Sequence, residues 1–98
     1  MMTAPVIGKR AKDLRGFRIA PNDSNYFACL FDPLEDGVSF TLVVEIFEPG
    51  GRTPPNTHQA AEECFVVLAG SGKAYADGQE MPISPGDAFV LRPGVEHV

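Results

Sequence analysis

Residues that bind transition metals through nitrogen or sulfur are scarce in this chain of 98 residues, which holds two histidines and two cysteines. It has no tryptophan and no run of about 18 apolar residues, so we expect no membrane span. The first residues lack the apolar core of an export signal, which predicts a cytoplasmic protein with Cys29 and Cys64 as reduced, buried thiols. No segment has the pattern of an amphipathic helix of ten or more residues, which excludes a helix-turn-helix module.

What the chain has in quantity is turn residues, with nine prolines and ten glycines. They separate short apolar segments with the β-branched and aromatic content of strands. The expected strands are residues 26–31, 38–47, 64–69, 73–76, 79–83 and 88–91. Asp77-Gly78 predicts a tight hairpin between two of them. The sequence therefore predicts one all-β domain, an antiparallel barrel or sandwich, over residues 20–98, preceded by an extended arm over residues 1–19.

Charge is distributed unevenly along the chain. Residues 1–18 carry five basic side chains and one acidic one, a net charge of +4, whereas the remaining residues carry three basic and twelve acidic ones, a net of −9. A basic arm could contact nucleic acid, but the acidic remainder would repel phosphate. We therefore expect no nucleic-acid partner and an arm that packs on its own acidic domain or on a second subunit.

Two distant segments carry the candidate site. His58 and Glu63 lie where a Gly- and Pro-rich loop enters an apolar segment, and His97 follows the turn at Pro93-Gly94. Side chains alternate along a strand, so Glu63 shares a face with Phe65, and this face should point to an apolar interior. A carboxylate in such a place needs a cation. Two imidazoles and one carboxylate can hold a divalent transition metal and leave coordination positions open. The alternative is that both histidines lie on surface loops without a metal.

The two segments resemble the two motifs of the cupin family. Gly50, His58, Glu63 and Gly70 match the first pattern, G-x5-H-x-H-x4-E-x6-G, and Gly86, Gly94 and His97 match the second, G-x5-P-x-G-x2-H. The resemblance covers about half of the chain. It implies a small antiparallel jelly-roll barrel with a metal held inside by His58, Glu63 and His97, and it implies a homodimer.

The chain departs from the family pattern at three places. Asn56 stands where the family has its first histidine, and its amide oxygen would be a weaker, harder ligand. Arg92 stands where the family has proline. The chain ends one residue after His97, before the strands that normally follow, so we expect its C-terminal end to be incomplete.

These residues predict a metal-dependent protein that acts on a small oxygenated organic molecule. The expected metal ligands are His58, Glu63, His97 and Asn56, and nitrogen and oxygen donors without sulfur suit Fe, Mn, Ni or Zn. Because both histidines would be ligands, neither remains as a general acid or base, which favours a dioxygenase-type oxidation that depends on the metal. The alternative is a non-catalytic module that binds a small ligand. Candidate substrate-binding residues are Arg52, Phe65, Tyr75 and Phe89, whose other interpretation is as ordinary core or surface side chains.

Overall fold

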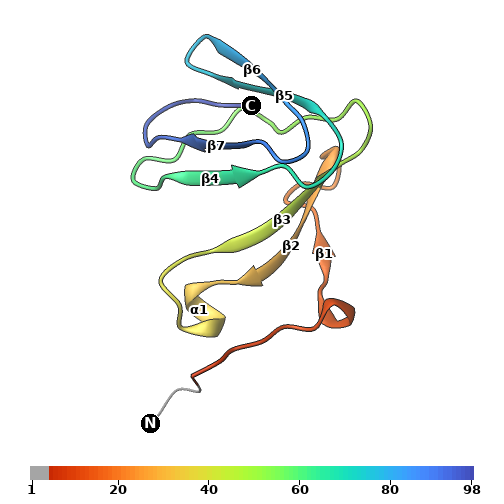
Figure 1. Ribbon diagram of the computed structural model, residues 1–98, viewed down its shortest axis with the longest axis vertical. Helices are drawn as coiled ribbons and strands as arrows, with labels where there is room; N and C mark the ends of the chain where they lie inside the picture. Colours follow the sequence, from red (N-terminus) through yellow and green to blue (C-terminus); the bar gives the residue numbers. More distant parts are fainter. Residues whose placement is uncertain (1–4) are drawn as a thin grey trace. The chain divides into compact units, whose positions relative to one another are not determined.

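The computed structural model describes residues 5–98. The first four residues of the predicted arm lie outside the described residues. The chain consists of two compact units, one ending at Arg52 and the other beginning at Thr53. Almost all of its regular structure is β-strand, as the sequence predicts (Figure 1). None of the helices among residues 5–98 is long and apolar enough to cross a membrane.

The first unit is a three-stranded antiparallel sheet in the order β1-β2-β3. Strand β1 (Gly16–Phe17) pairs with β2 (Asn25–Phe31), which pairs with β3 (Leu42–Phe47). A short 3-10 helix, η1 (Ala11–Asp13), precedes β1. The single-turn helix α1 (Pro33–Asp36) follows β2.

The structure shortens two expected strands, and the one expected at residues 64–69 ends at Val66. Residues 38–41 lie outside β3, although their β-branched and aromatic content predicts a strand from residue 38. The residues before this segment form α1. Asp32 caps its N-terminus, since its side chain accepts a hydrogen bond from the backbone N–H of Glu35 at 2.8 Å. Gly37 ends the helix in the left-handed region with φ 69°. Strand β3 begins only at Leu42, because Leu42 pairs with Phe31, the last residue of β2.

The second unit contains two antiparallel two-stranded ladders. Strand β4 (Glu63–Val66) pairs with β7 (Ala88–Leu91), and β5 (Gly72–Ala76) pairs with β6 (Gln79–Ile83). The predicted hairpin turn joining β5 to β6 is confirmed, because Asp77 and Gly78 have φ values of 49° and 76°.

The jelly-roll barrel implied by the resemblance is not closed by hydrogen bonds among residues 5–98. The ladders are short and separated by irregular loops, such as the stretch from residue 48 to 62, so they remain three separate sheets. The antiparallel all-β class is confirmed, and the closed barrel is not seen.

The expectation that both cysteines are buried is not met. Cys29 and Cys64 are free thiols, but Cys64 is exposed whereas Cys29 is half-buried. Along β4 the half-buried residues Glu63 and Phe65 alternate with exposed ones, and Cys64 lies on the exposed face.

The basic N-terminal segment packs on acidic side chains of its own unit. Lys9 Nζ lies 2.8 Å from Asp36 Oδ1, and Arg18 Nη2 lies 2.8 Å from Glu48 Oε1. The lysine ammonium also lies 5.7 Å from the ring centroid of Phe31. Hydrogen bonds from Lys9 and from the backbone of Asp32 hold the pKa of Asp36 below its ordinary value of 3.8. The bond to Asp36 in turn raises the pKa of Lys9 above 10.5.

We expect Lys9→Met to lower Tm by a few degrees at neutral pH, because Asp36 loses its partner while remaining largely covered. A lowered carboxyl pKa gives stability that is present above pH 3.8 and is lost as the pH falls through the lowered pKa. The raised pKa of Lys9 gives stability that is lost only as the pH rises beyond 10.5. Thermal denaturation followed by circular dichroism should therefore show a difference between variant and wild type that shrinks in acid.

Lys12→Met is the matched control, since Lys12 lies 3.3 Å from Asp13 with both side chains largely exposed. Its Tm should stay close to that of the wild type. An equal loss in the two variants, or a Lys9 effect that persists in acid, would contradict this role for the ion pair.

Candidate metal centre

Backbone pairing between two distant loops builds the centre of the second unit. The N–H of Asn56 donates to the carbonyl of His97 at 2.9 Å, and the N–H of His97 donates to the carbonyl of Asn56 at 2.8 Å. Val98 exchanges two further backbone hydrogen bonds with Tyr75, of 2.9 and 3.0 Å. The C-terminal residues are thus held between the loop that contains His58 and strand β5.

This pairing also decides which side chains meet. Residues that exchange both hydrogen bonds in an antiparallel pair lie directly opposite each other, and their side chains share one face. Asn56 and His97 are such a pair, and His58 follows Asn56 by two residues. The loop is held further by a 2.7 Å hydrogen bond from the N–H of Gly94 to the carbonyl of His58.

Glu63 reaches the same place from the first position of β4. It pairs with Leu91 of β7, so these two side chains lie on one face of the ladder, together with the pair Phe65 and Phe89. Leu91 and His97 are the buried residues of the second unit, each only 9% exposed. The carboxylate is therefore directed into the most protected part of this unit.

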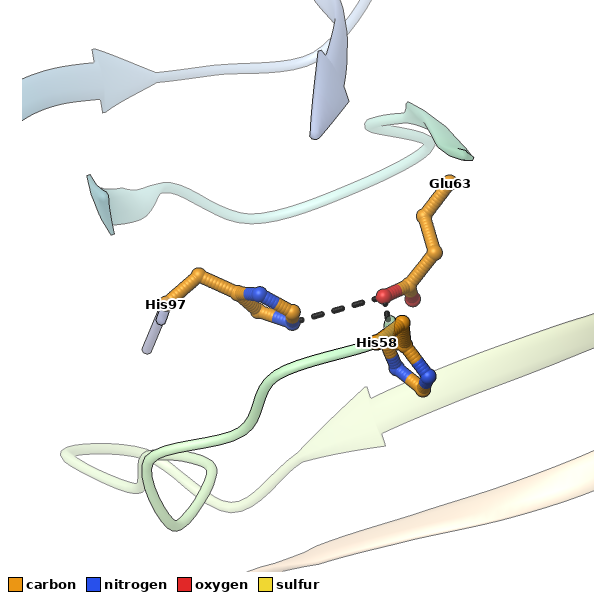
Figure 2. A group of neighbouring side chains, drawn as sticks. All are labelled: His58, Glu63 and His97. Carbon is orange, nitrogen blue, oxygen red and sulfur yellow. Dashed lines mark ion pairs between the residues drawn. The ribbon is translucent and has the colours of Figure 1, made fainter. Parts of the chain in front are cut away.

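The three side chains converge closely (Figure 2). His58 Nε2 lies 2.7 Å from Glu63 Oε1, and His97 Nε2 lies 3.4 Å from the same oxygen. One potential ligand atom from each residue lies within 4.8 Å of the other two. The imidazole rings are 5.7 Å apart between centroids and inclined by 24°.

The donor atoms fit a divalent metal ion. Glu63 Oε1 is buried and has no hydrogen bond, and its two close contacts are with His58 Nε2 and His97 Nε2. The other ring nitrogen of His97, Nδ1, lies 3.2 Å from the carbonyl oxygen of Val95, to which it can donate. That bond favours the tautomer whose Nε2 has its lone pair free, an arrangement common among metal-binding histidines. A proton shared between the carboxylate and an imidazole would be the alternative way to stabilise this cluster.

Asn56 lies beside the cluster, at a distance of 3.1 Å between its Nδ2 and His58 Nε2. The structure thus brings all four predicted metal ligands together. Two features of the site could not be expected from the sequence. The contact between His97 and the carbonyl of Val95 could not be predicted, because every residue has a backbone carbonyl. The role of Gly94 in holding the His58 loop was foreshadowed only by its place in the family motif.

The four predicted substrate-binding residues lie in different surroundings. The rings of Phe65 and Phe89 stack across β4 and β7, with centroids 4.8 Å apart and planes inclined by 6°, on the face that carries Glu63. Tyr75 is 43% exposed and, with His97, lines an open hollow formed by residues 75–80 and 94–98. Arg52 belongs to the first unit, where its backbone N–H and carbonyl bond to the hydroxyl of Ser24. The binding roles of these residues stay predictions.

A family model for the cupin domain matches residues 43–98, more than half of the chain. The chain belongs to the cupin family. Searches among curated proteins and among solved structures give no match. Cupin domains commonly bind metals, and the cluster of His58, Glu63 and His97 in this cupin could hold one.

Gly94→Ala tests how the cupin loop is held. Gly94 has φ 81° with nothing within 4 Å of an added Cβ, so the substitution strains only the backbone, at a cost of about 1 kcal/mol. Because its N–H holds His58, we expect both a lower Tm and weaker binding of Mn2+ measured by calorimetric titration.

Gly86→Ala is the control for this substitution. Gly86 has φ 90° and equally open surroundings, but its N–H bonds to Val67, away from the cluster. This variant should lose similar stability and keep its metal affinity. Equal metal affinity in both variants would show that the Gly94 bond does not position His58.

Proposed function

We propose that this cupin is a metal-dependent protein that acts on a small oxygenated organic molecule by a dioxygenase-type oxidation. The observation that carries the proposal is the convergence of His58 Nε2, His97 Nε2 and the buried Glu63 Oε1. We further propose that residues 20–98 act as one cupin domain and that the protein is a homodimer with a cytoplasmic location.

The donor set limits the chemistry. His58, His97 and Glu63 would hold Fe(II), Mn(II), Ni(II) or Zn(II), which suit nitrogen and oxygen donors without sulfur. Such an ion supplies Lewis acidity and, for Fe(II), reaction with O2. Three protein ligands on one side leave positions for the substrate. No third histidine exists in the sequence, so a reaction without a separate proton carrier fits best.

The residues around the cluster favour a partly apolar substrate. The stacked rings of Phe65 and Phe89 share the ladder face that carries Glu63. An apolar body could pack on such a surface while a hydroxyl or carboxylate group approaches Glu63 and the imidazoles. We propose Tyr75, which lines the same hollow as His97, as a further polar contact, whereas Arg52 stays a candidate from the sequence alone. Arg92 is a poorer candidate, because it lies 3.7 Å from Glu62, which precedes Glu63 and belongs to the other face of the strand.

A non-catalytic ligand-binding cupin is the second candidate. The observation that favours it is Asn56, which replaces an imidazole donor with a weaker amide. A protein of this kind would bind the same class of small molecule, with or without a metal.

Glu63→Gln and Glu62→Gln form a matched pair that tests the proposal. The first removes the charge from the cluster, and the second removes the adjacent charge that pairs with Arg92. We expect wild type and Glu62→Gln to hold about one ion per chain after purification without an affinity tag, and Glu63→Gln to lose it at least about tenfold more readily. Elemental analysis after dialysis against a weak chelator measures this. Equal metal content in the two variants would refute Glu63 as a ligand.

Oxygen consumption separates oxidation from binding. Protein loaded with Fe(II) should consume O2 when supplied with catechols or small hydroxy acids, and His58→Ala should abolish this. Calorimetric binding of the same compounds without any O2 uptake would leave the binding module as the function.

A further inference from the structure

Asn56 is placed to act on the metal centre through its side chain. Its backbone exchanges hydrogen bonds of 2.9 and 2.8 Å with His97, so the two side chains share a face. Substituting the Asn56 side chain leaves both backbone bonds available. The side chain can therefore be changed without removing the pairing that positions His97.

The amide lies within reach of the point where the ligands converge. Asn56 Nδ2 is 3.1 Å from His58 Nε2, which is itself 2.7 Å from Glu63 Oε1. Rotation of the amide about its last bond exchanges its oxygen and nitrogen, so the same position can present either a donor or an acceptor. With Nδ2 toward His58, the amide donates to the lone pair that an ion requires. With the oxygen toward the site, it adds a neutral oxygen ligand.

Both arrangements of the amide should lower the affinity most for ions that prefer imidazole ligands. A carboxamide oxygen suits Mn(II) better than Ni(II) or Zn(II), for which imidazole is the stronger ligand. We propose that Asn56 is a specificity-determining residue of this centre. Compared with a histidine at this position, it makes the affinities for Ni(II) and Zn(II) exceed the affinity for Mn(II) by a smaller factor. The inference rests on the proposed metal-binding function and concerns which ion is selected.

The test compares the affinities of wild type, Asn56→His, Asn56→Asp and Asn56→Ala for Mn2+, Ni2+ and Zn2+. Competition with a chromophoric chelator measures each dissociation constant on the full chain, and circular dichroism checks folding. We expect Asn56→His to tighten Ni2+ and Zn2+ by about tenfold or more, and Mn2+ by less than about threefold. Asn56→Asp keeps the shape and an oxygen donor, so it should tighten Mn2+ at least as much as Ni2+.

Asn56→Ala tests whether the amide of Asn56 is itself a metal ligand. Loss of the amide should weaken Mn2+ more than Ni2+, since only an oxygen ligand is removed. Equal gains for all three ions in Asn56→His, or affinities in the Asp and Ala variants that equal those of wild type, would overturn the inference while leaving the metal centre intact. Failure of wild type and of every variant to bind any of the ions would overturn the proposed function together with the inference.

Discussion

The mutual pair of backbone hydrogen bonds between Asn56 and His97 is the constraint on which the site depends. It closes a loop of about 40 residues, and such closure costs conformational entropy whatever the side chains are. The pairing of Glu63 with Leu91 in the β4–β7 ladder lies within this closed loop and shares that cost. Once both pairings are made, two imidazoles and a carboxylate meet without any local sequence relation between them.

The polar groups of the site also lower the stability of the second unit. Glu63 Oε1 is buried without a hydrogen bond, and such a group destabilises the fold unless a cation or proton compensates it. His97 is as buried as Leu91, so a polar ring occupies one of the most protected positions in this part of the chain. Binding of an ion by these groups would stabilise the folded state, because the unfolded chain presents no such arrangement.

Some features could be predicted from the sequence because their causes are local. Strand β7 has its expected bounds, and Asp77-Gly78 forms the hairpin, since turn chemistry and β-branched runs act over a few residues. Barrel closure could not be predicted in this way, because it depends on how distant strand edges pair. The early residues of the strand expected at 38–47 stay outside the sheet, because β2 ends at Phe31, opposite Leu42, and offers them no partner. The cluster of His58, Glu63 and His97 was predictable only because the spacing of its motifs encodes long-range pairing.

Register explains why neighbouring residues of the same type differ so much in this site. Glu62 and Glu63 are adjacent acids, yet one forms an exposed ion pair with Arg92 and the other meets both histidines. A shift of one residue in the β4–β7 pairing that set Glu62 opposite Leu91 would turn Glu62 toward the face of the histidines and Glu63 away from it. The burial of Leu91 opposite Glu63 therefore does more than pack the unit: it selects the register in which a metal can bind.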